Sequence, residues 1–114
     1  MLLPHLDRQT YAAGDVIFRE GDTGDCAYLI ESGAVDLHVR GGLLATLAAN
    51  AIFGEMALID GEPRMATATS TAKTTVIILP KKLLESRLVG VDPFIARIIH
   101  ILVKNVRTVT DKAF

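Results

Sequence analysis

Residues 53–69 read FGEMALIDGEPRMATAT, and this stretch indicates both a local fold and a binding site. Gly54 lets the backbone approach another group closely, and the residues after it suit one short helical turn. Gly-Glu-Pro at residues 61–63 then predicts a reversal of the chain before Arg64. The N–H groups of a short helix start and the guanidinium fork of an arginine both suit a small anion. The stretch therefore predicts an anion-binding loop.

Glu55 stands inside this loop, where its negative charge would repel an anion. A carboxylate beside an anion site is useful when it faces another part of the same ligand, such as a sugar diol that donates hydrogen bonds. The combination of Glu55 with Arg64 therefore favours a ligand that carries both a phosphate and a sugar hydroxyl.

Two segments of the loop resemble the phosphate-binding cassette of the cyclic-nucleotide-binding domain family: Phe53-Gly54-Glu55-Met56-Ala57-Leu58 and Pro63-Arg64-Met65-Ala66-Thr67. The resemblance continues upstream, in the order and spacing of the family, through Gly14-Asp15-Val16-Ile17-Phe18, Gly21-Asp22, Tyr28-Leu29-Ile30 and Ser32-Gly33. It covers nearly the whole chain, so residues 1–114 are expected to form one domain of this kind. One position departs from the family pattern, because Asn50 stands where a glycine is usual. Asn tolerates positive φ better than most residues, so the turn is expected to survive.

The resemblance implies a cyclic nucleotide as ligand and gives each site residue a role. Glu55 is expected to accept a hydrogen bond from the ribose 2′-hydroxyl, and Arg64 is expected to pair with the cyclic phosphate. Backbone groups around five further residues are expected to complete the cradle: Gly54, Met56, Ala57, Met65 and Ala66.

The resemblance also implies a preference for cyclic AMP (cAMP) over cyclic GMP (cGMP), with cGMP as the second candidate. In the family, a hydroxyl residue at the position of Ala66 favours cGMP because it bonds the guanine 2-amino group, whereas alanine goes with cAMP. Thr67 carries a hydroxyl, but strand alternation after Arg64 is expected to turn it to the opposite face from Ala66.

The composition limits the partners that this chain is expected to have. Its 114 residues are enough for one ordinary domain. A net charge of −1 provides no overall basic field for direct binding of nucleic acid or of an anionic membrane. The single cysteine, Cys26, excludes an internal disulfide and is expected to lie in the core. The sequence shows neither a signal peptide nor an apolar run of ~20 residues, which indicates a cytoplasmic protein without a membrane span.

Short apolar runs separated by turn signals predict a mainly β fold. Val35, Leu37 and Val39 alternate with polar residues, which is typical of a strand with one buried face. Gly41-Gly42 is expected to close a tight hairpin after that strand. The predicted strands span residues 9–11, 16–19, 27–31, 35–40, 43–47, 65–72 and 75–79. This spacing favours an antiparallel jelly roll, or double-stranded β-helix, of about eight strands.

Beyond Pro80 the period changes to that of helices. Residues 81–89 place leucines at helical spacing before Gly90, and Asp92-Pro93 provides a cap and a first residue for a longer helix to about Thr110. The apolar residues of this helix cover more than one stripe, so part of its surface needs another partner. The resemblance implies that these C-terminal helices act as a hinge and lid that pass nucleotide binding to an effector domain or partner protein. A homodimer through the helix is the other expectation, and the chain itself is expected to be an excised regulatory domain or a small stand-alone sensor.

Each site residue also has a purely structural interpretation. Arg64 is readily explained as a surface arginine, Glu55 as the complement of a helix start, and Ala57 and Ala66 as packing residues. Two strand residues are interpreted as core, with the wall of a base pocket as the alternative: Leu37 and Leu44.

Two other classes of function stay open at this level. Jelly rolls also carry metal-dependent enzymes, in which two or three histidines and a carboxylate hold one ion. His5, His38 and His100 lie in the terminal stub, on the outward face of a strand and on the last helix, so neither a metal site nor a catalytic residue is predicted. The second alternative is a degenerate domain that keeps the roll as an interaction module but binds no ligand. The presence of both Glu55 and Arg64 argues against it.

Overall fold

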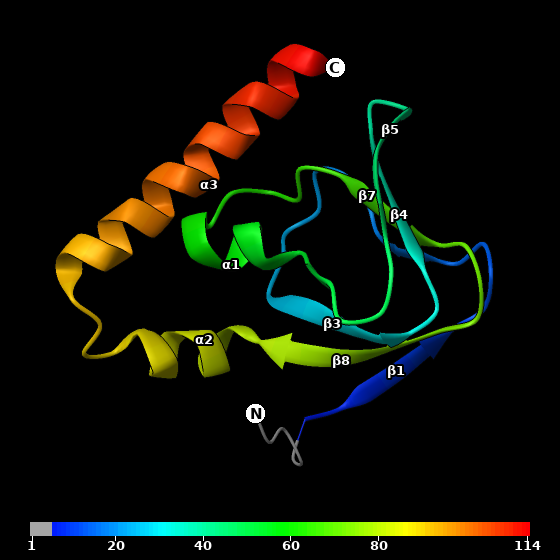
Figure 1. The fold of residues 1–114 in the computed structure, drawn as a ribbon, viewed down its shortest axis with the longest axis horizontal. Helices are drawn as coiled ribbons and strands as arrows, with labels where there is room; N and C mark the ends of the chain where they lie inside the picture. The colour runs from blue at the N-terminus through cyan, green and yellow to red at the C-terminus, as the bar shows by residue number, and fades with distance from the viewer. Residues whose placement is uncertain (1–5) are drawn as a thin grey trace.

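The computed structural model describes residues 6–114 and shows a chain of short strands followed by helices (Figure 1). The strands are β1 (Arg8–Tyr11), β2 (Val16–Phe18), β3 (Cys26–Ser32), β4 (Val35–Val39), β5 (Gly42–Leu47), β6 (Ile52–Phe53), β7 (Thr67–Ser70) and β8 (Thr74–Pro80). The helices are α1 (Glu55–Asp60), α2 (Lys81–Leu88) and α3 (Pro93–Ala113).

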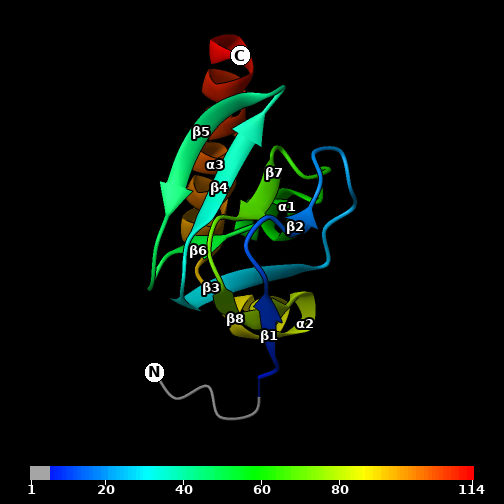
Figure 2. The same ribbon diagram turned by 90° about the vertical axis from the view of Figure 1, so that its right-hand side faces the viewer.

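The eight strands form two antiparallel four-stranded sheets, and this arrangement confirms the predicted jelly roll. One sheet has the order β1-β8-β3-β6 and the other the order β2-β7-β4-β5. Helix α2 continues directly from β8, and α3 then runs back along the roll and packs against α1 (Figures 1 and 2). The C-terminal helix therefore lies beside the one helix that interrupts the strands.

The core lies between the two sheets and draws residues from both. Its buried cluster consists of Tyr28, Ile30, Val35, Phe53, Ala68 and Val76. Val35 and Val39 are 0% and 2% exposed, as the predicted alternation along β4 requires, whereas Asp36, Leu37 and His38 between them are all half-buried. Complete burial of a large apolar side chain stabilises the fold by about 1.5–3 kcal/mol. Cys26 is half-buried and packs against this cluster.

Two turns depend on non-glycine residues with positive φ. Asn50 has φ 74°, and its N–H donates to the carbonyl of Ile30 at 2.8 Å, so the predicted turn at this position is confirmed. The hairpin between β4 and β5 turns at Arg40-Gly41, and the prediction of Gly41-Gly42 is wrong by one residue. Both turn residues have positive φ, as a two-residue hairpin that follows the sheet twist requires. Arg40 tolerates this backbone while its N–H donates to the Glu20 carboxylate at 2.9 Å.

Most strand boundaries differ from the sequence prediction by one residue, and three larger differences have a clear physical cause. The two-residue strand β6 was not predicted, because two residues are too few to show a period and the strand exists only through pairing with β3. Strand β7 begins at Thr67, because the two residues after Arg64 belong to the bend that lines a cavity. Helix α3 continues beyond Thr110 to Ala113, since no helix-breaking residue stands between them.

Candidate functional site

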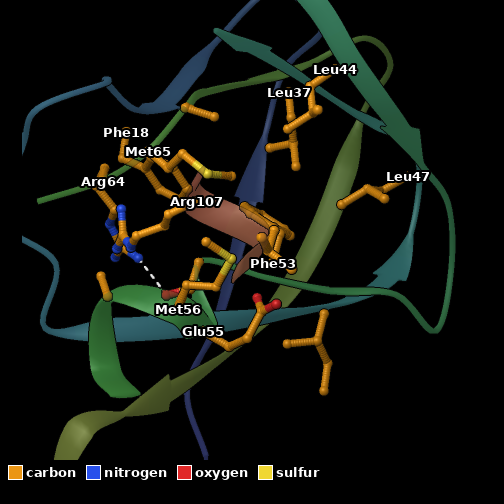
Figure 3. A pocket seen from close by; sticks show the side chains of 15 residues that line it. Phe18, Leu37, Leu44, Leu47, Phe53, Glu55, Met56, Arg64, Met65 and Arg107 are labelled. Atoms are coloured by element: carbon orange, nitrogen blue, oxygen red, sulfur yellow. Dashed lines mark hydrogen bonds between the residues drawn. The ribbon is translucent and has the colours of Figure 1, made fainter. Parts of the chain in front are cut away.

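A cavity of about 250 Å³ lies between the β2-β7-β4-β5 sheet, the segment from β6 to α1, and helix α3 (Figure 3). The structure brings all the predicted site residues to its wall: Gly54, Glu55, Met56, Ala57, Arg64, Met65 and Ala66. The remaining lining residues were not predicted as site residues: Phe18, Leu37, Leu44, Leu47, Ile52, Phe53, Val106 and Arg107.

Arg64 is buried on this wall, with 5% of its surface exposed, so its interpretation as a surface arginine is wrong. Its guanidinium donates from Nη1 to the carbonyl of Gly54 and from Nη2 to the carbonyl of Cys26, both at 2.6 Å. Its carbon Cζ lies 4.2 Å from the centre of the Phe18 ring. The buried Nε has no hydrogen-bond partner in the part of the chain that the structure describes. A buried charged group with an unused donor is costly unless a further partner meets it.

The backbone on both sides of Arg64 is fixed by short hydrogen bonds. Gly61 ends α1 with φ 70°, and its N–H donates to the carbonyl of Ala57 at 3.0 Å, as the predicted reversal requires. The N–H of Arg64 donates to the carbonyl of Asp22 at 2.7 Å, and its own carbonyl accepts from Gly21 at 2.8 Å. The arginine therefore starts from a backbone position that is tied to the loop between β2 and β3.

Position 54 makes two structural demands that only glycine, among the amino acids, meets together. Gly54 caps α1 with φ 80°, a conformation that L side chains rarely adopt. A Cβ atom at this position would also lie 2.6 Å from Nη1 of Arg64. No side chain caps α1, so the first N–H groups of the helix have no partner from that source.

Glu55 is the first residue of α1, and its half-buried side chain lies on the cavity wall (Figure 3). Burial raises the pKa of the Glu55 carboxyl, while a hydrogen bond from its own backbone and the positive charge of Arg64 act in the opposite direction. The residue thus stands in the first helical turn, as its structural interpretation requires, and also faces the cavity.

Ala66 and Thr67 face different ways, as the alternation argument predicted. Ala66 is 5% exposed and lines the cavity. The hydroxyl of Thr67 instead accepts a hydrogen bond from the N–H of Glu20 at 3.0 Å. Its only observed partner therefore lies in the loop after β2.

Leu37 and Leu44 both line the cavity, as the alternative interpretation requires, and Leu37 also packs against the core cluster, as its interpretation as a core residue requires. The pairing of β4 with β5 shifts register between Leu37 and His38 and leaves Leu44 without a partner on β4. Such a bulge re-aims side chains locally. Alternation along the two strands signals inward-facing leucines, but it does not tell which part of the interior stays open.

Comparison with known sequences decides the family. The family model described as "Cyclic nucleotide-binding domain" matches residues 8–88. The chain belongs to the cyclic nucleotide-binding domain family.

Relatives of this cyclic nucleotide-binding domain include a kinase regulatory subunit and an enzyme. The cAMP-dependent protein kinase regulatory subunit of Eremothecium gossypii is 36% identical over 108 residues, which are 94% of this chain and 22% of that protein. Among solved structures, an EAL enzyme in its cAMP-bound form has a TM-score of 0.89 at 31% identity, over 94% of this chain and 30% of the other. The cGMP-bound form of that enzyme gives 0.85 at 32% identity, over the same shares of the two chains. This chain thus spans less than a third of the length of these relatives.

Helix α3 of the domain contributes two residues to the cavity that the sequence did not indicate, Val106 and Arg107. The guanidinium of Arg107 forms an ion pair with Asp60 at the end of α1, with Nε donating to Oδ2 and Nη2 donating to Oδ1 at 3.0 Å. Its Nη1 donates to the carbonyl of Pro63 at 3.0 Å. Because 47 residues separate Arg107 from Asp60 in the chain, no local sequence pattern predicts this ion pair.

The two described histidines lie away from the cavity. His38 is half-buried on β4, and His100 is exposed on α3, where its Nδ1 lies 2.8 Å from the carbonyl of Ala96. His5 lies outside the described residues. Within residues 6–114, no group of three or more histidine, cysteine, aspartate or glutamate side chains is placed to hold a metal ion.

Within residues 6–114, no helix is both long enough and apolar enough to span a membrane.

The raised pKa of Glu55 predicts a pH-dependent stability. The folded domain binds this proton more tightly than the unfolded chain, so the contribution of the protonated carboxyl is complete at low pH and is lost as the pH rises through the folded pKa. We expect ligand-free Glu55→Gln to melt at a higher temperature than the parent near neutral pH. The difference should disappear as the pH falls towards about 4, the ordinary range of a glutamate.

Melting curves by circular dichroism over that pH range test this expectation. Glu62→Gln, at an exposed position in the loop after α1, is the matched control. A Glu55→Gln variant that is less stable than the parent at neutral pH would contradict the burial argument.

Proposed function

We propose that this domain is a regulatory sensor that binds a cyclic nucleotide between Arg64 and Glu55, with cAMP preferred to cGMP. One observation supports the proposal above all others. A buried guanidinium with an unpaired Nε and a half-buried carboxylate share the wall of one cavity. Its volume of about 250 Å³ is close to the lower end of small-molecule pockets, roughly 300 Å³.

Arg64 would meet the cyclic phosphate. A charge-assisted bond between a guanidinium and a phosphate is shorter and about twice as strong as a neutral hydrogen bond. The start of α1, which no side chain caps, would add backbone donors beside Gly54, Met56 and Ala57. Met65 and Ala66 follow Arg64 on the wall and would complete the cradle.

Glu55 would accept the ribose 2′-hydroxyl. An ionised carboxylate accepts hydrogen bonds only, so it discriminates between the diol end and the phosphate end of one ligand. Partial burial strengthens such a bond, because the effective dielectric constant is lower than in water. The ligand would therefore enter in one orientation.

The base would lie against the apolar part of the wall, formed by Leu37, Leu44, Leu47 and Ile52. Ala66 supplies no hydroxyl for the 2-amino group of guanine, and the hydroxyl of Thr67 is engaged by Glu20. Adenine has no such amino group, so the wall suits it better.

We further propose that α3 transmits occupancy to an effector domain or partner protein. Val106 lines the cavity, and Arg107 holds the end of α1 and the residue before Arg64. A ligand shifts this helix only if it makes different contacts in two positions of the helix. The outer side of α3 is apolar and exposed, as at Phe94 and Leu102, and is the surface that an effector or a second copy would cover.

We propose that residues 1–114 form one cyclic-nucleotide-binding domain, that this domain performs no catalysis itself, and that the protein is cytoplasmic. A degenerate interaction module is the competing proposal. It gives no reason for an unpaired buried Nε beside an acidic side chain in an open cavity.

The first prediction concerns binding itself. A ligand that binds only the folded state stabilises it by about 2.7 kcal/mol at a hundredfold excess over Kd. We therefore expect cAMP at that excess to raise the melting temperature by roughly 10 °C. Arg64→Lys keeps the charge but loses the fork, so it should weaken binding at least about tenfold.

Melting curves with and without nucleotide measure the first effect, and calorimetric titration of folded protein measures the second. Arg97→Lys, at an exposed position on α3, is the matched control. If neither cAMP nor cGMP shifts the melting temperature, the sensor function is wrong. If Arg64→Lys binds as tightly as the parent, the assignment of the phosphate contact is wrong.

The second prediction concerns the base. An unmade hydrogen bond to the buried guanine amino group costs roughly 1–3 kcal/mol, so the parent should prefer cAMP by about five- to a hundredfold. Ala66→Thr should raise the affinity for cGMP and leave that for cAMP nearly unchanged. Titration of both proteins with both nucleotides measures this, and a parent that prefers cGMP would overturn the selectivity argument.

The third prediction concerns α3. If the helix closes on bound nucleotide, amide hydrogen exchange in residues 94–110 should slow when cAMP is added, whereas β8 at the core should change little. Hydrogen exchange measured by mass spectrometry tests this. Equal protection with and without nucleotide would make α3 a fixed part of the fold, and its exposed apolar side would then be tested as a dimer interface by sedimentation.

A further inference from the structure

We infer that Phe18 and Gly24 are positioning residues for Arg64, which hold its guanidinium in place before the ligand arrives. The inference rests on the proposed function, because it assigns the placement of the group that would meet the phosphate. Neither residue belongs to the loop of residues 53–69, from which the sequence predicted the site.

Phe18 supports the guanidinium through its ring. It lies at the end of β2, and its ring centre is 4.2 Å from Cζ of Arg64. A cation at this distance from an aromatic face is attracted by the ring quadrupole, most strongly where water is excluded. Arg64 is 5% exposed, so the contact is largely desolvated.

Neighbouring aromatic rings hold Phe18 itself in place. Its ring centre lies 5.9 Å from those of Tyr28 and Phe53, and these two rings stack on each other at 5.0 Å. Tyr28 and Phe53 belong to the buried core cluster. The support under Arg64 is therefore part of the core and does not depend on a mobile loop.

Gly24 encloses the guanidinium from the loop between β2 and β3. A Cβ atom at Gly24 would lie 2.6 Å from both Cζ and Nε of Arg64 and 2.9 Å from Cβ of Ala57. Gly24 does not have a left-handed backbone, unlike Gly14 and Gly21, which have open space around them. Glycine at position 24 therefore leaves room for the Arg64 guanidinium and is not required there by the backbone conformation.

Together with the carbonyls of Gly54 and Cys26, these contacts restrict the guanidinium on several sides. A group that is already held in its bound position loses little conformational freedom when the ligand binds. Changing Phe18 or Gly24 should consequently weaken phosphate binding although neither residue carries a charge.

The test uses the full chain with Phe18→Leu, Gly24→Ala and Arg64→Lys, titrated calorimetrically with cAMP. We expect each of the first two variants to bind about tenfold more weakly than the parent. Combining either variant with Arg64→Lys should weaken cAMP binding little beyond the effect of Arg64→Lys alone. A residue that acts through the guanidinium of Arg64 has no effect once that guanidinium is absent. Gly42→Ala is the matched control, because the atoms nearest to its Cβ would belong to the Phe114 ring and to a backbone carbonyl of the β4–β5 hairpin and not to Arg64.

The NMR signal of the Arg64 Nε–H, recorded without ligand, provides a readout that does not need binding. It should move or broaden in Phe18→Leu and Gly24→Ala and stay unchanged in Gly42→Ala. This inference would be overturned if Phe18→Leu and Gly24→Ala changed neither the affinity for cAMP nor the Nε–H signal. It would also be overturned if their losses of affinity added fully to the loss caused by Arg64→Lys in the double variants. Either result would leave the proposed function standing. A parent that binds neither nucleotide would overturn the proposed function, while the Nε–H signal would still decide whether the two residues position Arg64.

Discussion

The buried guanidinium of Arg64 is the group on which the rest of the site depends. Its two hydrogen bonds to backbone carbonyls join the loop before α1 to strand β3, and the Phe18 ring connects it to the core. Burying a charge is costly unless hydrogen bonds and neighbouring dipoles compensate it. These contacts compensate the charge in part and leave Nε without a hydrogen-bond partner among residues 6–114, at the edge of an apolar cavity where we propose that it meets an anion.

The end of α1 and the loop that follows it connect the cavity to the C-terminal helix. Asp60 and Pro63, which accept hydrogen bonds from Arg107, stand four residues and one residue before Arg64 in the chain. The side chains of Arg107 and Asp60 are only 20% and 16% exposed, so their ion pair is better shielded from solvent than a surface pair. Any displacement of this loop by a ligand therefore acts directly on α3, which gives the proposed regulation a physical path.

The sequence predicted best what is determined locally. The glycine and proline signals around α1 and the tolerance of Asn50 for positive φ follow from backbone sterics, and the structure has them as predicted. Strand β6 and the pairing of Arg107 with Asp60 could not be predicted, because each depends on a partner far away in the chain. The role of Leu44 stayed ambiguous for a similar reason: alternation gives the face of a strand, but an open cavity is a property of the assembled sheets.

A crystal structure of the chain with cAMP bound tests the central claim most directly, because it locates the ligand relative to both charged groups. The account predicts that the cyclic phosphate lies within about 2.7–2.9 Å of the Arg64 guanidinium, with the ribose 2′-hydroxyl on Glu55 and adenine against the leucine wall. A nucleotide bound outside this cavity, or one bound inside it with Arg64 still paired only to the carbonyls of Gly54 and Cys26, would contradict the account.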